Sequence, residues 1–365
     1  MSPPGRPKGE CRSAQHEGTP VSPPGRPKGE CRSAQHEGTP VNGAALRHRP
    51  RRRQRGAALL LAMIILTMVV TVTAGMVWQQ KRAVEVEAAE RARVQAAWIL
   101  GGALDWARLI LREDQRNNQQ RGRNYDALDE PWATPLAEAR LSTFLAADKD
   151  NNADGGPEAF ISGSIVDAQA RYNLRALVDG EGKPVPAQVA ALQRLCQLAG
   201  LAGDTAERIA AGLAAAQAPA GSAVDAPLPP MQLPDLAWLG IDAATIDRLA
   251  PWVELLPVPT AVNVNTAERE VLVAAIDGLD LGTAERLVQM RQRKPFATLD
   301  EVKAQLPEGT VVDPARAGVA SGFFEVAGRL RLEERVLEER SLLQRRGADV
   351  VVLRRERRSF AAASR

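Results

Sequence analysis

The pattern most suited to metal chemistry is the acidic stretch DKDNNADGGPE at residues 148–158. Asp150, Asn152 and Asp154 stand at alternate positions and a glycine follows them, which is the spacing at which calcium-loop side chains converge on one ion. A twelve-residue loop of this kind ends in a bidentate glutamate, and Ile161 occupies that position here. Two interpretations therefore stay open, a calcium site formed by these three side chains and an acidic surface turn.

Histidine and cysteine, which serve nucleophilic catalysis and zinc binding, are concentrated at the start of the chain. All three histidines and two of the three cysteines precede residue 57, namely His16, His36, His48, Cys11 and Cys31. If that part is removed, Cys196 remains alone, within an apolar helical pattern typical of a buried small side chain. A Ser–His–Asp triad, a Cys–His pair, an intramolecular disulfide and a His- or Cys-rich zinc site are then excluded. We expect neither an enzyme nor a cofactor, with calcium as the one ion to test.

The first 56 residues hold the basic charge of the chain. The formal net charge is +3, yet residues 57–365 carry more acidic than basic side chains, which argues against a nucleic-acid-binding body. Residues 2–20 and 22–40 are identical copies of SPPGRPKGECRSAQHEGTP, too polar and too rich in Pro and Gly for a solenoid. We consider a disordered cytoplasmic tail, and alternatively translation that begins at Val41, since valine can be encoded by the alternative start codon GTG.

An uncharged apolar stretch at residues 57–78 follows directly on a cluster of arginines. It is long enough to cross a bilayer, which takes ~20 residues, and the arginines predict a cytoplasmic N-terminus. Three interpretations compete: a secretory signal peptide with a poor cleavage motif at residues 72–74, an uncleaved signal anchor, and a prepilin-type leader cut after Gly56. The third fits best, because basic residues run up to Gly56 and the apolar stretch starts at Ala57.

The stretch after the apolar segment continues a helical pattern. No proline occurs from Gln79 to Arg116, and a stripe at helical spacing consists of Val94, Ala97, Gly101, Leu104, Arg108 and Leu111. We predict one helix from about 57 to about 113, roughly 85 Å long at 1.5 Å per residue, whose second half lies against a globular head. The alternative is a membrane span followed by a separate core helix.

The rest of the chain alternates between strand and helix patterns. A polar loop is expected at about 114–156, followed by strands in FISGSIVDAQARYNL at 160–174. Short helices are predicted at 187–199, 203–216, 243–250, 267–276, 282–293 and 298–305, and strands at 322–333, 335–343 and 349–357. The basic run RRERR at 354–358 is expected to end a strand on a solvated face. This order predicts an α+β head with an all-α domain inserted into its sheet.

Residues 263–306 resemble a helix-hairpin-helix repeat of competence-type DNA receptors. Such hairpins bind phosphate through backbone N–H groups at a Gly-apolar-Gly turn, but the turn at 278–282 is two residues longer and places Asp280 where a phosphate would approach. The basic candidates for phosphate contacts are Arg286, Arg291, Arg293 and Lys294, and the acidic side chains that oppose them are Asp277, Asp280, Glu285, Asp300 and Glu301. A protein–protein helical module is the favoured interpretation.

Four stretches together resemble the type IV pilin and type II secretion pseudopilin superfamily. They are QRGAALLL at 54–61, ISGSIVDAQARYNLRAL at 161–177, VNVNTAEREVLVAAI at 262–276 and SGFFEVAGRLRL at 321–332. Their order spans nearly everything after residue 50 and resembles the minor pseudopilin K (general secretion pathway protein K) family. The RYNL and NVNTA stretches are the specific ones, whereas an apolar helix alone is weak evidence.

The resemblance implies processing by a prepilin peptidase, with cleavage between Gly56 and Ala57 and N-methylation of Ala57. Ala57 departs from the larger residue common at this position. Most pilins carry glutamate at the fifth mature position, where this chain has Leu61, and the K family characteristically lacks that glutamate. A carboxylate in the bilayer is costly unless it pairs with the terminal ammonium of a neighbouring subunit. A subunit with Leu61 cannot make that contact.

The resemblance further implies a structural subunit at the tip of the pseudopilus that supports export across the outer membrane. Its expected partners are the minor pseudopilins I and J, other pseudopilus subunits, the prepilin peptidase and the bacterial inner membrane. The expected fold is a long pilin-type helix packed on a small antiparallel sheet, with an all-α domain (SAM/helix-hairpin-helix-like) inserted. The alternatives are a minor pilin of another type IV filament and a membrane-anchored DNA receptor.

These expectations divide the chain into six regions. They are the duplicated segment and basic leader at 1–56, the membrane half of the helix at 57–78, its periplasmic half at 79–116, the first part of the head at 117–183, the inserted all-α domain at 184–310 and the C-terminal strands at 311–365.

Overall fold

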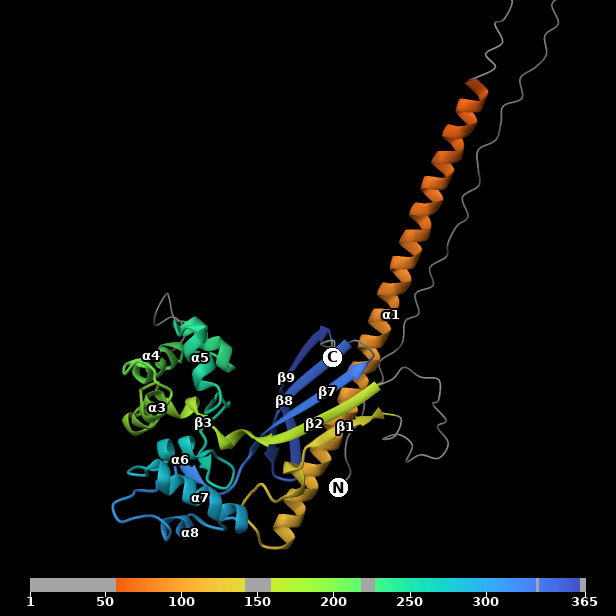
Figure 1. The fold of residues 1–365 in the computed structure, drawn as a ribbon. Coiled ribbons are helices and arrows are strands. Elements are labelled where there is room, and N and C mark those ends of the chain that lie inside the picture. The colour runs from red at the N-terminus through yellow and green to blue at the C-terminus, as the bar shows by residue number, and fades with distance from the viewer. Residues whose placement is uncertain (1–56, 142–158, 218–226, 333–334, 362–365) are drawn as a thin grey trace, which may run out of the picture. The chain divides into compact units, whose positions relative to one another are not determined.

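The computed structural model describes residues 57–141, 159–217, 227–332 and 335–361 (Figure 1). The chain divides into two units, residues 1–72 and 73–365. Gly56 and the predicted calcium ligands Asp150, Asn152 and Asp154 lie outside the described residues, so their roles stay predictions.

Helices and strands follow one another in the order strand, helical insert, strand after one long helix. The α-helices are α1 (Ala57–Gln120), α3 (Pro186–Leu198), α4 (Thr205–Ala216), α5 (Ala243–Leu249), α6 (Arg269–Ala275), α7 (Leu281–Arg293) and α8 (Leu299–Lys303). The 3-10 helices are η1 (Pro131–Ala133), η2 (Ala168–Ala170), η3 (Leu174–Leu177) and η4 (Leu233–Leu239). The strands are β1 (Leu136–Arg140), β2 (Ala159–Asp167), β3 (Tyr172–Asn173), β4 (Val253–Glu254), β5 (Val262–Asn263), β6 (Ala317–Gly318), β7 (Phe323–Leu332), β8 (Arg335–Arg346) and β9 (Asp349–Ala361).

Five strands form one antiparallel sheet in the order β1-β2-β7-β8-β9. Strand β2 pairs with β7 over its whole length, from Ala159 opposite Leu332 to Asp167 opposite Phe324. All helices from α3 to α8 lie between these two paired strands in the chain. The predicted α+β head with an all-α insertion is therefore confirmed.

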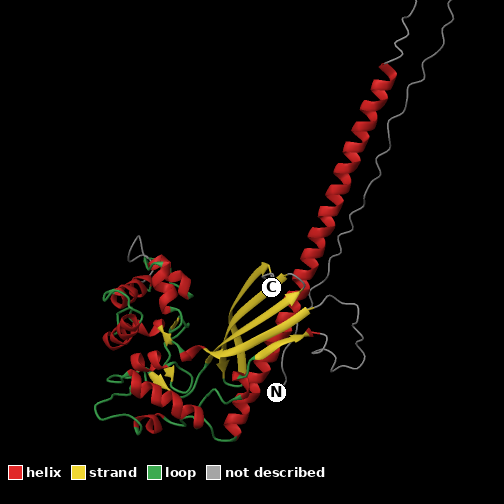
Figure 2. Cartoon of the chain, in the orientation of Figure 1, coloured by secondary structure: helices red, strands yellow, loops and turns green. Residues whose placement is uncertain are grey.

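The C-terminal part of α1 packs against one face of this sheet, as Figure 2 shows. Buried side chains of α1 such as Leu104 and Leu111 meet Ile165, Phe324 and Val326 of β2 and β7. Gly328 permits the close approach, because a Cβ at that position would lie 3.1 Å from Leu100 Cδ2. The helix thus covers the sheet through small and branched apolar side chains.

The opposite face of the sheet meets the insert. Phe323 and Leu342 of the sheet form a cluster with Ala168 and Leu256. The insert itself has a larger apolar core to which α3, α4, α6 and α7 contribute, and this core reaches from Tyr172 to Ala317. It therefore extends beyond the predicted limits of 184–310. The difference arises from the two-residue parallel ladders β3–β4 and β5–β6, which are too short to give a periodic pattern.

The predicted polar loop at 114–156 is partly wrong. Helix α1 continues to Gln120, and η1 and β1 follow before residue 141. The helix continues because Leu111 and Asp114 are both buried against the head, whereas the sequence after Arg112 is too polar to suggest burial. Strand β1 has the weak pattern LAEAR and is largely exposed, so it gave no recognisable alternation.

Candidate assembly surface

Residues 57–72 form the described part of the first unit, and every one of their side chains is exposed. In the described part of the chain, α1 is the helix that is long and apolar enough to cross a membrane. Ala57 is its first residue, and Leu61 presents an exposed apolar side chain one turn later. An apolar helix surface of this kind needs lipid or other helices around it, because contact between apolar side chains and water is unfavourable.

The part of α1 after residue 78 has two apolar faces rather than one. The buried face consists of Ala96, Leu100, Leu104, Ala107 and Leu111. Of the predicted stripe, Leu104 and Leu111 belong to it, whereas Val94 is exposed and the others are at most partly buried. The predicted stripe is therefore partly right, and Val94 was included because spacing alone does not separate it from the buried face.

The second apolar face is open to solvent within the described part of the chain. It consists of Val94, Trp98, Trp106 and Leu109, which we call the open stripe, with exposed fractions of 53%, 78%, 57% and 49%. Their spacing of four, eight and three residues places them along one side of the helix. Exposed tryptophans in a row are costly in water and are typical of protein interfaces.

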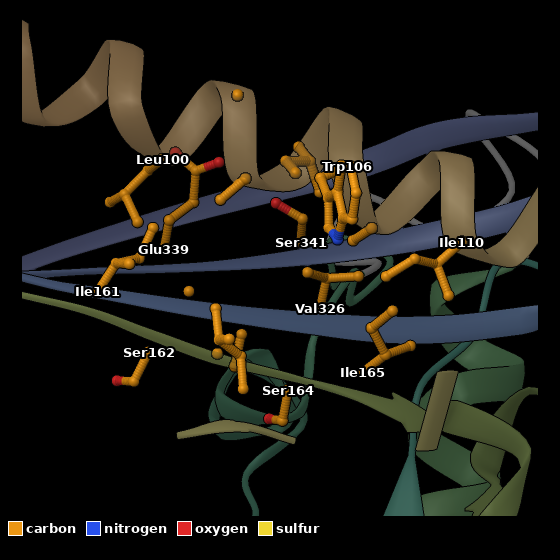
Figure 3. A pocket seen from close by; sticks show the side chains of 18 of the residues that line it. Leu100, Trp106, Ile110, Ile161, Ser162, Ser164, Ile165, Val326, Glu339 and Ser341 are labelled. Carbon is orange, nitrogen blue, oxygen red and sulfur yellow. The ribbon is translucent and has the colours of Figure 1, made fainter. Parts of the chain in front are cut away.

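A cavity of about 610 Å³ lies between this part of α1 and the sheet (Figure 3). Trp98 and Trp106 of the open stripe line it from the helix, and Ile161, Ile165 and Val326 line it from β2 and β7. The cavity and the open stripe therefore form one continuous apolar surface, which we call the assembly surface.

A buried polar network joins the insert to the sheet where the two distinctive sequence stretches meet. Asp167, at the end of β2, accepts hydrogen bonds from Thr266 Oγ1 (2.6 Å), Ser321 Oγ (2.6 Å), Asn263 Nδ2 (2.9 Å) and the Gln169 amide (2.8 Å). Burial raises the pKa of the Asp167 carboxyl, and these hydrogen bonds oppose the rise. The NVNTA stretch is thus structural, because its polar side chains make hydrogen bonds inside the protein.

The RYNL stretch makes a second internal junction. The Asn173 side chain accepts from the Leu256 amide (3.1 Å) and donates to Val258 O (2.7 Å), which fixes the segment after β4. Arg171 lies between Glu254 (3.0 Å) of the insert and Glu325 (2.6 Å) of β7. The sequence marks the RYNL and NVNTA stretches as distinctive but does not reveal their structural roles, because the residues that they contact lie far away along the chain.

Three buried carboxylates, which sequence analysis missed, come together at the end of α1. Oxygens of Asp114, Asp126 and Glu130 lie within 4.8 Å of one another. Arg345 pairs with Asp114 at 2.6 Å and also with Asp126, while Glu130 accepts from Asn118 Nδ2 (2.7 Å), Trp132 Nε1 (2.8 Å) and the Ala127 amide (3.0 Å).

Burial, followed by the nearby Glu130, raises the pKa of Asp114 to about 6. A cluster of this kind offers oxygen ligands, but an arginine and several N–H donors already occupy it. The arrangement ties the end of α1 to β8 through Arg345.

The hairpin between α6 and α7 differs from a phosphate-binding turn. Asp280 caps α7, accepting from the amides of Gly282 (2.8 Å) and Thr283 (3.0 Å). Hydrogen bonds from Thr283 lower the pKa of Asp280, so the carboxylate stays ionised. The backbone donors that would bind phosphate are thus taken by an anion of the chain itself.

The basic side chains proposed for DNA contact are not all available. Arg291 is buried and donates to Val264 O at 2.5 Å, and burial lowers its pKa to about 10. Asp277 is held by Arg194 (2.7 Å) and Arg316. This geometry favours a protein-packing role for the hairpin.

One further expectation agrees with the structure. Cys196 is buried in the insert core, where burial raises its thiol pKa to about 11, so it behaves as a small apolar side chain.

The expectation that the RRERR run ends a strand on a solvated face is partly wrong. The run lies within β9, which continues to Ala361 because β8 pairs with it that far. Arg357 pairs with the buried Glu339, and Arg354 donates to Met231 O at 2.7 Å.

Comparisons with known proteins point to one family. Two family profiles, both described as type II secretion system (T2SS), protein K, match residues 170–258 and 262–320. Type II secretion system protein K of Pseudomonas aeruginosa is 30% identical over 317 residues, which cover 81% of this chain and 90% of the relative. The protein of the same name from Pectobacterium carotovorum is 30% identical over 339 residues, covering 84% and 97%.

The fold is also similar to a solved structure. A chain in the crystal structure of the GspK-GspI-GspJ complex from the enterotoxigenic Escherichia coli type 2 secretion system matches with a TM-score of 0.54 and 21% identity. The match covers 76% of this chain and 99% of that chain. At this identity it supports the fold described above.

Proposed function

Because this chain belongs to the type II secretion system protein K family, we propose that it is a structural minor pseudopilin at the tip of the pseudopilus that supports protein export across the outer membrane. The observation that carries the proposal is the open stripe. A helix that buries one apolar face in its own head and leaves a second free is suited to packing against helices of other subunits.

The proposed topology follows from charge and length. Residues 57–78 span the inner membrane once, and the arginines before Gly56 keep the N-terminus in the cytoplasm. Residues 79–365 then lie in the periplasm. The role is structural, and no chemistry is assigned to the chain itself.

Processing makes the protein a substrate of the prepilin peptidase, which cuts between Gly56 and Ala57 and methylates Ala57. Intact mass and N-terminal sequencing of the membrane-extracted protein test this step, and we expect a chain that begins at methylated Ala57. An uncut chain, or one that begins at Gly75, would contradict it.

Minor pseudopilins I and J are the proposed partners. The similar fold comes from a complex whose title names GspK, GspI and GspJ, and the open stripe supplies a surface for them. Leu61 supports a terminal position, because an apolar residue there cannot pair with the terminal ammonium of another subunit.

A secretion assay tests the proposal in the host. In a strain that lacks this chain, the wild type should restore export of the system's secreted proteins, whereas the double variant Trp98→Ala with Trp106→Ala should not. Gln95→Ala, which truncates an exposed polar side chain on the same helix, is the matched control and should restore export. Full export by the double variant at equal protein level would contradict the role of the open stripe.

The second candidate, a membrane-anchored DNA receptor, rests on the hairpin resemblance. It predicts tight binding of duplex DNA by the full chain that weakens steeply with salt. We expect no such binding because Asp280 fills the helix terminus. A minor pilin of another type IV filament would instead assemble with that filament's subunits rather than with I and J.

Calcium is proposed only for the loop at 148–158. Isothermal titration of the full chain with calcium should give one site that is lost in Asp150→Asn with Asp154→Asn. Equal heats for the wild type and this variant would favour the acidic surface turn.

A further inference from the structure

The cavity under α1 exists because both of its walls carry small residues. Gly102 and Ala103 line it from the helix, and Gly163 and Gly328 line it from β2 and β7. Protein interiors are otherwise packed about as densely as organic crystals, and ligand pockets typically measure roughly 300–1,000 Å³. A cavity of about 610 Å³ at the side of a core helix is therefore large enough for one or two big side chains.

The floor of this apolar cavity is polar. Ser341 of β8 is 1% exposed, lines the cavity, and its Oγ has no hydrogen-bond partner among the described residues. Glu339, two residues earlier, is equally buried; Arg357 bonds its Oε2, but its Oε1 lacks a hydrogen bond although Arg355 Nε lies 3.2 Å away. Figure 3 shows both side chains on the sheet, directed toward the helix.

These two atoms restrict what fits in the cavity. A hydrocarbon tail would leave the buried hydroxyl unpaired, which costs free energy. A cationic group has little to gain, because Glu339 already faces the guanidinium groups of Arg355 and Arg357. The best match is an apolar body with a neutral N–H or O–H at its tip, which among side chains means tryptophan or tyrosine.

We propose that the cavity receives a tryptophan or tyrosine side chain from a helix of another filament subunit, with Ser341 Oγ accepting its hydrogen bond. Trp98 and Trp106 belong both to the cavity wall and to the open stripe, so a helix packed on the stripe lies next to the cavity mouth. The inference rests on the proposed assembly function and specifies its anchor, since buried aromatic side chains dominate binding energy at interfaces.

Filling the cavity from within tests the anchor. Gly102→Phe starts a side chain in open space at the cavity wall, and Gly101→Phe is the matched control, because its Cβ also meets nothing within 4 Å and it does not line the cavity. We expect Gly102→Phe to weaken the complex of the full chain with minor pseudopilins I and J at least tenfold, and Gly101→Phe to change it less than twofold.

The outcomes separate the two proposals. If the wild type forms no complex with I and J, the proposed function fails. If the wild type and both variants bind equally well, the anchor proposal is overturned and the proposed function stands.

A small probe tests the chemistry of the floor without a partner. Fluorine NMR of 5-fluoroindole with the full chain in lipid nanodiscs should detect binding that Ser341→Ala weakens about tenfold, the loss of one hydrogen bond. Fluorobenzene, which has no donor, should bind both proteins alike, and Gly102→Phe should exclude both probes. Equal affinity of 5-fluoroindole for the wild type and Ser341→Ala, or its displacement by dodecanoate at lower concentration than by indole, would overturn the aromatic anchor and favour a lipid occupant.

Discussion

At the scale of single residues, the Asp167 carboxylate is the point where insert and sheet are joined. It ends β2 and receives hydrogen bonds from Asn263 of β5, from Thr266 just after β5 and from Ser321 in the segment before β7. Without the carboxylate, these buried donors would lack an acceptor, which destabilises the folded state. The network therefore contributes specificity to the junction.

Replacing this acceptor should destabilise the protein. In Asp167→Asn, an amide N–H₂ would replace one acceptor and face donors, so we expect the free energy of unfolding to fall by about 1–3 kcal/mol. Asp129→Asn, on the exposed loop before η1, is the control and should change it by less than about 0.5 kcal/mol. Chemical denaturation of both variants gives the comparison, and equal midpoints would refute the role of Asp167.

Asp114 should make stability depend on pH. Its pKa is raised from 3.8 to about 6 in the folded protein, so between these values the folded state keeps a proton that the unfolded state has lost. Its contribution is therefore full below pH 4 and is lost as the pH rises through 6. Relative to Asp114→Asn, the wild type should lose about 2–3 kcal/mol of unfolding free energy between pH 4 and pH 7. A constant difference across this range would contradict the raised pKa.

The residues of these networks can be read from the sequence, but which of them pair with one another cannot. Asp167 and Asn263 are 96 residues apart, and Asp126 and Arg345 are 219 apart. Spacing along the chain cannot pair such groups, so the RYNL and NVNTA stretches were recognised as distinctive while their structural roles remained hidden.

At the scale of secondary structure, the two faces of α1 explain both a correct and an incorrect prediction. The absence of proline gave one continuous helix, and the structure has it from Ala57 to Gln120. The predicted stripe was only partly right, because Leu104 and Leu111 are buried whereas Val94 is exposed. A helix with a second, exposed apolar face shows a helical pattern that does not reveal which face is buried.

Two glycines near this helix should respond to alanine in opposite ways. Gly102→Ala adds a good helix former in open space and should raise the free energy of unfolding by about 0.5–1 kcal/mol. Gly328→Ala brings a Cβ within 3.1 Å of Leu100 Cδ2 and should lower it by about 1 kcal/mol or more. Thermal unfolding of the two variants measures the contrast, and stabilisation by Gly328→Ala would contradict the tight packing of α1 on the sheet.

The short helices of the insert were predicted well, since each has a run of apolar residues bounded by Pro, Gly or a capping side chain. Asp280 and Thr298 both cap helices through side-chain hydrogen bonds. Strand β3 falls within the stretch 160–174 that was predicted as strands, whereas β4 to β6 were missed, because pairs of only two residues have no alternation to detect.

At the scale of the whole molecule, the order strand, helical insert, strand is enough to predict the α+β class. Register is not predictable in the same way, since β2 and β7 are joined only after more than 150 residues of intervening chain. The cavity could not be predicted from the sequence either, because it depends on small residues of α1, β2 and β7 facing one another. Family membership came from short motifs whose residues turned out to be internal junctions.

The measurement that tests the central claim most directly is the assembly state of the mature chain with minor pseudopilins I and J. Light scattering of the purified mixture in detergent should give one complex with a single copy of each subunit. The double variant Trp98→Ala with Trp106→Ala should remain folded but should not form the complex with I and J. A wild-type chain that stays monomeric with I and J, or that stacks on itself as a repeating filament subunit, would contradict the account.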